Sequence, residues 1–374
     1  MPDFDVSRGW VILVPPGLAQ VNKAAEDLSR YIGLLAGMKP GLSPKPSVSS
    51  KPFAPLITGD DPAPTGPVII LNSDCGDPDE NGFSWRVGDG RIEIFGESGR
   101  GLCNGIYSFL AALGISWPFP GEEKLPAPTM INSANVVQVS PVFTLTSGGM
   151  HEPSRRKERN SAVSRRFIPA GKKTANFILR NGEAFTAWAA RRRYDAIIYP
   201  LTAFASESKR KKLRQLKQFA AEYGIALEAG GHELSSLVPR KYFFLHRDYF
   251  RMVEGRRKKE HHFCPTSPGA IRLAGREAEK LFRAAGEVKV FHLWPDKGAE
   301  RVWCSCPTCR AFSPQEQNRI GVNTAADILA SVDPEAHITF FEQSGEEINI
   351  PLRKNLVRME KLPEERELRN SGNY

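Results

Sequence analysis

A group of cysteines in the second half of the chain has the residue types of a metal site. The candidate ligands are Cys264, Cys304, Cys306 and Cys309. The last two have the C-x-x-C spacing that is common in zinc sites, and His261 or His262 is an alternative fourth ligand. Because zinc prefers four sulfur or nitrogen ligands in a tetrahedron, the pattern predicts a structural zinc site. Loop packing or a local disulfide is the alternative interpretation. A redox site is disfavoured, because nothing else in the sequence indicates a thioredoxin-like unit.

A second group of chemically useful side chains follows the apolar runs of the same half. These runs, at 142–149, 195–201, 224–233, 287–296 and 336–343, are predicted strands. The side chains near their ends are His151 and Glu152, Tyr199, His232 and Glu233, Trp294 and Asp296, and Glu342 and Gln343. In (β/α) barrels, functional groups collect at the carboxyl ends of the strands.

Carboxylates at several strand ends are what glycoside hydrolysis requires. One carboxylic acid protonates the leaving oxygen, and a second carboxylate attacks or activates water. We predict Asp296 and Glu342 as this pair, with roles that the sequence does not assign. The predicted substrate contacts are His151, Tyr199, His232, Glu233 and Trp294, the last through stacking on a sugar. The alternative is that such acids cap the next helix or lie in solvent.

The elements that must position these groups alternate between strand and helix. Helices are predicted at 182–192, 206–223, 268–285 and 315–332, and a sixth strand opens at 355–363. Repeated βα units with continuously apolar strands indicate a parallel sheet. We therefore expect a TIM-barrel-like domain, with a doubly wound sheet as the second choice. Five or six strands are fewer than the eight of a closed barrel, so the barrel is expected to be truncated or completed by a partner chain or oligomer.

The first part of the chain has a different pattern. Strands are predicted at 67–73, 83–89 and 91–97, and the last two are joined by a Gly-Asp-Gly hairpin turn. Amphipathic helices are predicted at 18–36 and 99–113. The fold class is therefore α/β, with an α+β domain at 1–138 followed by the barrel domain at 139–374.

Composition and charge limit the classes of partner that we expect for this chain. The net charge of +9 comes largely from basic runs such as 208–219, in which Leu213 and Leu216 lie on one helical face and the lysines on the other. No nucleic-acid motif accompanies these runs, so nucleic-acid binding is disfavoured. No run approaches the ~20 apolar residues of a membrane helix. The first residues do not resemble a signal peptide, so we expect a cytoplasmic protein, or an exported one whose signal has been removed.

The segment IEIFGESGRGLCNGIYSFLAALGISWPFPGE (92–122) resembles the N-terminal domain that precedes the catalytic barrel in α-glucuronidases and β-N-acetylhexosaminidases. The matching pattern is I-x-x-x-G-x-S-x-x-G-x-x-x-G-x-Y-x-F-L-x-x-L-G-x-x-W. Its glycines permit a tight turn into a helix that packs on the sheet.

The second half resembles a bacterial family that couples this domain to a glycosidase-like barrel of unknown function. The matching segments are AWAARRRYDAI (187–197), GGHE, the spaced segment 246–268, FHLWPDKG with CSCPTC, and NTAADIL (323–329). The resemblance implies an enzyme that hydrolyses a poly- or oligosaccharide without a cofactor. Asp296 is followed by Lys297 instead of the glutamate of hexosaminidases, so substrate-assisted hydrolysis of N-acetyl sugars is not supported.

Two other functions remain open. The same face could bind carbohydrate without hydrolysing it, or the protein could be a zinc-stabilised one centred on the CSCPTC loop. The basic segment 255–262 lies in a loop on the predicted active face, and an acidic sugar such as a uronate would suit its charge.

Overall fold

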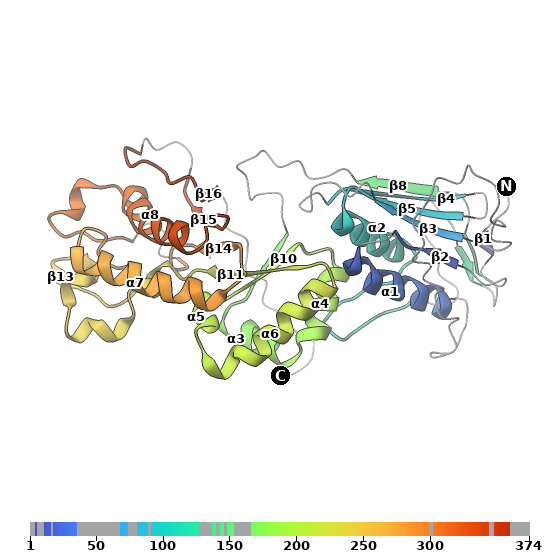
Figure 1. Cartoon of the computed structure of the whole chain (residues 1–374), viewed down its shortest axis with the longest axis horizontal. Coiled ribbons are helices and arrows are strands. Elements are labelled where there is room, and N and C mark those ends of the chain that lie inside the picture. The colour runs from blue at the N-terminus through green and yellow to red at the C-terminus, as the bar shows by residue number, and fades with distance from the viewer. Residues whose placement is uncertain are drawn as a thin grey trace.

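The computed structural model describes residues 4–5, 11–15, 18–35, 68–73, 81–88, 91–126, 137–139, 143–145, 148–152, 166–298, 302–343 and 348–359. Two principal sheets, one built from each half of the chain, are separated by helices (Figure 1). We refer to them as the N-terminal sheet and the C-terminal sheet.

The N-terminal sheet is mixed and carries its helices on one face. Its strand order is β2 (Val11–Leu13), β3 (Val68–Ser73), β5 (Arg91–Gly96), β4 (Phe83–Gly88) and β8 (Gly148–Glu152). Helices α1 (Ala19–Leu35) and α2 (Gly99–Ala112) pack on each other, and α2 lies on β4 and β5. A small separate sheet contains β1 (Phe4–Asp5), β7 (Phe143–Leu145) and β6 (Val137–Val139). The antiparallel β4–β5 hairpin confirms the Gly-Asp-Gly prediction.

The glycine pattern of residues 92–122 explains how α2 approaches this sheet. The side chain of Ser98 accepts a hydrogen bond from the backbone N–H of Gly101 at 3.1 Å and caps the helix. A Cβ at Gly101 would collide with the carbonyl oxygen of Gly82. A Cβ at Gly105 would crowd the side chain of Ile94 in β5. Close packing of this helix on the sheet therefore requires glycine at both positions.

The C-terminal sheet contains six parallel strands whose order in space follows their order in the chain. They are β9 (Phe167–Pro169), β10 (Ala196–Tyr199), β11 (Ala226–Gly231), β14 (Val290–Leu293), β15 (His337–Phe341) and β16 (Leu356–Met359). The intervening helices are α3 (Lys172–Arg180), α4 (Gly182–Arg191), α5 (Leu201–Phe204), α6 (Glu207–Glu222), α7 (Pro268–Ala285) and α8 (Pro314–Val332). A doubly wound sheet would reverse its strand order at a switch point, so this succession is that of a TIM-barrel-type fold.

The first strand of the C-terminal sheet is not the one expected from the sequence. Within the run 142–149, β7 belongs to the small sheet, and β8 pairs antiparallel with β4 in the N-terminal sheet. The first barrel strand is β9, a short strand that ends in Pro169. Proline is compatible with this position because β9 lies at the edge of the described sheet. The predicted boundary between residues 138 and 139 stays a prediction, although pairing with the N-terminal sheet extends to Glu152.

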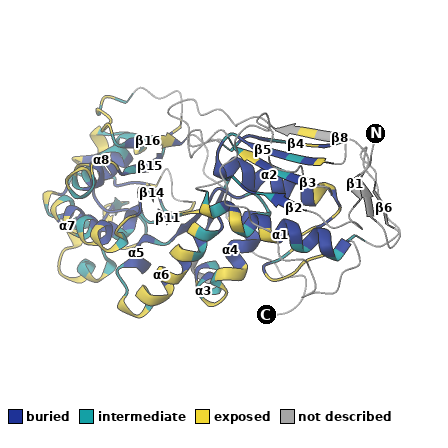
Figure 2. Ribbon diagram, turned by 45° about the vertical axis from the view of Figure 1, so that its right-hand side comes forward, coloured by how far each residue is buried: buried dark blue, intermediate teal, exposed yellow. Residues whose placement is uncertain are grey.

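Helices from the two halves pack together between the sheets. Helix α1 contacts α6, and α2 contacts α4. Buried apolar side chains form one continuous cluster that runs from the N-terminal sheet into the C-terminal sheet. The helices of both halves turn their buried faces inward (Figure 2). The two halves are therefore joined by a packed interface.

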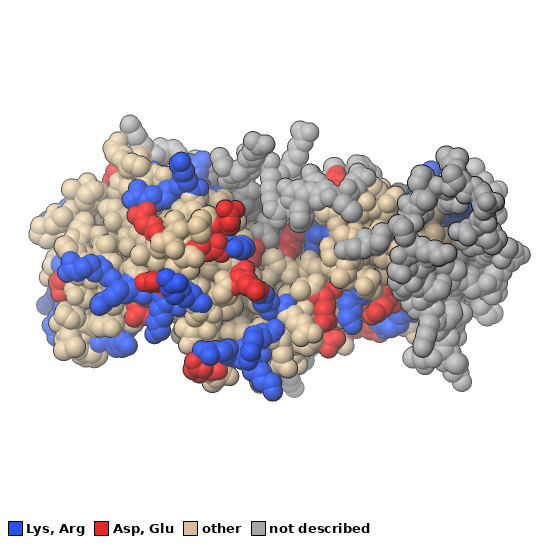
Figure 3. All heavy atoms as spheres, viewed as in Figure 1, with Lys and Arg blue, Asp and Glu red and all other residues tan. Residues whose placement is uncertain are grey.

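The basic run of α6 lies mainly toward solvent. Leu213, Leu216 and Ala220 are its buried residues, and its lysines and arginines are mostly exposed, which confirms the predicted amphipathic stripe. On the face shown in Figure 3, basic and acidic side chains are interspersed. Among the described helices, none is both long enough and apolar enough to span a bilayer.

Candidate active site and a cluster of four cysteines

The inside of the C-terminal sheet holds a buried polar network that sequence analysis did not predict. His292 lies in the middle of β14. Its Nε2 is 2.8 Å from Oε2 of Glu228, and its Nδ1 is 2.6 Å from Oγ1 of Thr339. Trp294 donates from Nε1 to the same Thr339 oxygen at 3.1 Å. All four side chains are buried. The sequence feature that could have predicted this network is a histidine and a glutamate inside otherwise apolar strands, because buried polar groups require partners.

The two aromatic side chains predicted to contact the substrate, Trp294 and Tyr199, are both buried. The Trp294 ring is 0% exposed and meets the rings of His232 and His292 edge-on. Tyr199 is also 0% exposed, its hydroxyl donates to the carbonyl of Ala175 at 3.0 Å, and burial raises its pKa to about 12. Neither ring offers an open face to a sugar in this structure. In this structure each ring packs beside the sheet, and direct contact with a substrate stays a prediction for both.

Asp296 lies at the carboxyl end of β14 and keeps partial access to solvent. Its side chain is 19% exposed. One carboxylate oxygen lies 3.5 Å from an Nη2 of Arg240, in the 3₁₀ turn η4 (Arg240–Phe244), and 3.6 Å from Nδ1 of His261. Burial lowers the pKa of Arg240, and the charges of Asp296 and Glu260 oppose that effect. These long contacts leave the carboxylate able to accept a further hydrogen bond.

His232 and Glu233 follow β11, the neighbour of β14. Since a carbonyl can only accept, Nδ1 of His232 donates to the carbonyl oxygen of Pro295, at 2.5 Å. The carboxylate of Glu233 accepts from the backbone N–H of Leu201 and from Oγ1 of Thr202 at the start of α5. Burial raises the pKa of Glu233, while these hydrogen bonds act in the opposite direction. Glu233 therefore has the helix-capping contacts that were the alternative to substrate contact.

Glu342 follows β15 on the other side of β14, but it is enclosed by arginines. It is 3% exposed, and its Oε2 accepts from Nε and Nη2 of Arg319 at 3.0 and 2.5 Å. Nη1 of Arg358 lies 3.8 Å from the other oxygen. Asp296 and Glu342 thus leave neighbouring parallel strands at the same edge, and each has its own arginine.

His151 lies elsewhere. It is within β8, opposite Ser84 of β4, and its side chain is outside the described atoms. The same holds for Glu152, which pairs with Phe83 through the backbone. The prediction that these residues follow a barrel strand is wrong, because the strand that contains them completes the open edge of the N-terminal sheet instead.

The structure brings the four predicted cysteines together. The Sγ atoms of Cys264, Cys304, Cys306 and Cys309 all lie within 4.8 Å of one another. All four side chains are buried, and none of them forms a disulfide. We call this group the four-cysteine cluster. The alternative histidine ligands are engaged elsewhere: His261 faces Asp296, and His262 stacks on the Trp303 ring with centroids 4.1 Å apart.

The fold has well-defined counterparts among solved structures. Flavobacterium johnsoniae chitobiase superposes with a TM-score of 0.53 at 12% identity, over 91% of this chain and 50% of that one. Streptomyces plicatus N-acetyl-β-hexosaminidase gives a TM-score of 0.50 at 11% identity, over 91% of this chain and 62% of that one. The chain thus spans less than two thirds of the length of either enzyme. No family sequence model and no curated protein sequence matches it. At such identities the likeness shows the TIM-barrel-type fold alone.

Proposed function

We propose that the chain is a glycoside hydrolase whose site lies at the carboxyl ends of β11, β14 and β15. The observation that carries this proposal is Asp296, a partly exposed carboxylate between a guanidinium and an imidazole at the end of a central strand. In TIM-barrel enzymes this edge of the sheet carries the chemistry. The fold alone supplies no function, so the residues around Asp296 must supply it.

Asp296 and Glu342 are the proposed carboxylate pair. Hydrolysis of a glycosidic bond needs one group to protonate the leaving oxygen and one carboxylate to attack or to activate water. No cofactor is needed for either step. Lys297, in place of a glutamate after Asp296, argues for a substrate other than one hydrolysed with the help of its own N-acetyl group.

Arg240 is the cation best placed to recognise an acidic sugar. Its Nη1 atom is buried and has no hydrogen-bond partner among the described residues, and its Nη2 lies beside Asp296. Arginine binds carboxylates through two parallel hydrogen bonds, which a uronate could accept. Within the basic segment predicted for this role, Arg257 is engaged elsewhere, since its Nη1 donates to the carbonyl of Phe250 at 2.7 Å and lies 3.8 Å from Sγ of Cys304.

A second candidate function is carbohydrate binding without hydrolysis. It is favoured by the enclosure of Glu342, whose carboxylate is already held by Arg319. A site with one accessible carboxylate would bind a sugar but would lack the second group that hydrolysis needs. Carbohydrate is the proposed partner in both cases.

The two candidates are separated by assaying the full chain against a panel of aryl glycosides and aryl glucuronides. We expect turnover, and we expect Asp296→Asn and Glu342→Gln each to lower kcat/KM by about 10²–10⁴-fold. Glu279→Gln is the matched control, because Glu279 lies on α7 and, within the described part of the chain, forms an ion pair only with Arg283. Turnover that survives both site substitutions would contradict the assignment. Absent turnover with saturable sugar binding by calorimetry would select the binding function.

A further inference from the structure

We propose that the four-cysteine cluster binds one Zn²⁺ ion, which holds the long loop after β11 to the loop after β14. Cys264 comes from the first loop, and the other three sulfur atoms come from the second. This structural metal site goes beyond the proposed hydrolase activity and does not depend on it.

The spacing of the sulfur atoms fits a tetrahedral zinc site. Sγ of Cys264 lies 3.8 Å from that of Cys306 and 3.6 Å from that of Cys309. With Zn–S bonds of ~2.3 Å, tetrahedral geometry requires sulfur atoms ~3.8 Å apart. A pair of disulfides would bring the sulfurs together two by two at ~2.05 Å and would not require all four to converge. The convergence of four thiols on one point therefore favours an ion.

The groups around the sulfur atoms suit an anionic zinc–thiolate centre. Four thiolates and one Zn²⁺ ion carry two net negative charges, which neighbouring donors and cations must offset. The backbone N–H of Met252 donates to Sγ of Cys304 at 3.2 Å, and Nη1 of Arg257 lies 3.8 Å from the same sulfur. Oγ1 of Thr266 lies 3.0 Å from Sγ of Cys309. These contacts are independent of the sulfur geometry and point to the same centre.

A short hairpin places two of these groups. Strands β12 (Met252–Val253) and β13 (Arg256–Arg257) pair antiparallel, with Glu254 and Gly255 between them at φ values of 50° and 73°. That turn belongs to the type that suits a two-residue hairpin. The basic run that appeared suited to an acidic sugar thus turns Arg257 toward the cysteines.

Gln317 of α8, which is 3% exposed, holds the loop after β14 in place. Its Oε1 accepts from the N–H of Cys304 at 3.0 Å, and its Nε2 lies within 3.2 Å of the carbonyl oxygens of Cys304, Cys309 and Phe312. One amide therefore fixes the backbone at both ends of the CSCPTC segment. Such orientation of the ligands before binding lowers the entropic cost of forming the site.

The ion would also define one wall of the candidate active site. His261 lies three residues before Cys264 and contacts Asp296. An ion that fixes Cys264 therefore restricts the position of the imidazole beside that carboxylate. Among the described residues, no hydrogen bond or ion pair joins the four-cysteine cluster to Asp296, so the role of the metal is structural, as in closed four-cysteine zinc sites.

The first test is metal analysis of the full chain, purified without chelator. We expect close to one zinc ion per chain by mass spectrometry, and a large loss of zinc in Cys306→Ser and Cys309→Ser. Cys103→Ala is the control, because Cys103 is a buried cysteine of α2 in the N-terminal half. Four free thiols without metal, two disulfides, or iron in place of zinc would each overturn the proposal.

A second measurement uses the unaltered chain, so it does not depend on the folding of a variant. Zinc is removed with a strong chelator, and trypsin cleavage after Arg256, Lys258 and Lys259 is followed by mass spectrometry. We expect this cleavage to accelerate on removal and to slow again when Zn²⁺ is added back. Cleavage after Lys211 and Lys212, exposed on α6, is the internal control and should not change. Equal acceleration at both places, or at neither, would contradict the role in holding the loops.

Discussion

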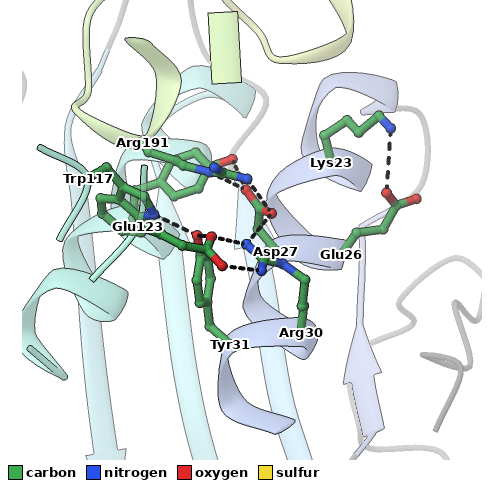
Figure 4. A network of polar contacts seen from close by, with 9 residues as sticks. Lys23, Glu26, Asp27, Arg30, Tyr31, Trp117, Glu123 and Arg191 are labelled. Atoms are coloured by element: carbon green, nitrogen blue, oxygen red, sulfur yellow. Dashed lines mark hydrogen bonds and ion pairs between the residues drawn. The ribbon is translucent and has the colours of Figure 1, made fainter. Parts of the chain in front are cut away.

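The two ends of the C-terminal sheet carry arginine–carboxylate pairs of opposite character. At the amino ends, Arg191 is the last residue of α4 and donates from Nε and Nη2 to the two oxygens of Asp27 in α1, both at 2.9 Å (Figure 4). At the carboxyl ends, Arg240 approaches one oxygen of Asp296 at 3.5 Å. The first pair is bidentate and joins the two halves of the molecule. The second is long and partly exposed.

The amino-end pair belongs to a wider network. Tyr107 donates to Asp27 at 3.2 Å, and Tyr31 donates to Glu123 at 2.6 Å while accepting from Nε1 of Trp117 at 2.7 Å. Trp188 of α4 donates to the carbonyl of Trp117 at 3.0 Å. Side chains whose donors and acceptors are engaged in short contacts of this kind stabilise an interface, and they leave no hydrogen-bonding group for a ligand. The difference indicates that the amino-end pair serves stability, whereas the Arg240–Asp296 pair leaves its carboxylate accessible. Glu342, at the same carboxyl ends, is held closely by Arg319.

Breaking the bidentate pair should produce the largest effect on stability. In Arg191→Met, Asp27 remains about one-tenth exposed without its main partner. We expect a loss of about 3–5 kcal/mol in the free energy of unfolding, because among the described residues the buried Asp27 carboxylate then keeps only one ion pair, at 3.8 Å with Arg30. Urea unfolding at neutral pH measures it. The double variant Asp27→Leu with Arg191→Met should recover part of the loss, since it removes both charges. A loss below about 1 kcal/mol in the single variant would show that the Arg191–Asp27 pair contributes no more than an exposed ion pair.

A smaller effect is expected at the edge of the same network. Glu123 accepts hydrogen bonds from both Nη atoms of Arg30, which hold its pKa down to about 2 from a usual value of 4.5. A carboxylate with a lowered pKa stabilises the folded state above its unfolded pKa and loses that contribution as the pH falls. Because the side chains of Arg30 and Glu123 are 41% and 35% exposed, solvent screens the pair, and Glu123→Gln should cost about 1 kcal/mol at neutral pH.

The pH dependence distinguishes this contribution from simple packing. The difference between the original chain and Glu123→Gln should be full at neutral pH and should shrink as the pH falls from about 4.5 toward about 2. Urea unfolding at a series of pH values measures it. A difference that stays constant over that range would show that the side chain acts through its shape alone.

The sequence predicted much of the fold for physical reasons that can be stated. Long amphipathic stripes, as in α1 and α7, predicted these helices to within a residue or so at each end. Apolar runs of parallel strands predicted β14 and β15. By contrast, β9 was missed because it is three residues long and ends in a proline, and the helix α3 was not predicted. Such short elements form through tertiary contacts, which a local pattern does not contain.

The candidate site also contains features that the sequence predicted and features that it did not. Parallel strands send their following loops to one edge, and this rule suggested that Cys264 would meet the CSCPTC segment. The same rule brought Asp296 and Glu342 to that edge. It did not indicate which side of a strand a residue faces. Tyr199 therefore proved to pack against α3, and the contact between His292 and Glu228 inside the barrel was not foreseen.

The smallest effect on stability is expected from Asp296→Asn, and its small size is the informative result. The contacts of Asp296 at 3.5 and 3.6 Å are too long for strong hydrogen bonds, and the side chain shares its position with solvent. We expect the free energy of unfolding to change by less than about 0.5 kcal/mol, as for surface positions away from special features. Urea unfolding beside Arg191→Met gives the comparison directly. A loss as large as that of the amino-end variant would make Asp296 a structural residue. The carboxyl end would then lack the accessible carboxylate from which the proposed hydrolysis starts.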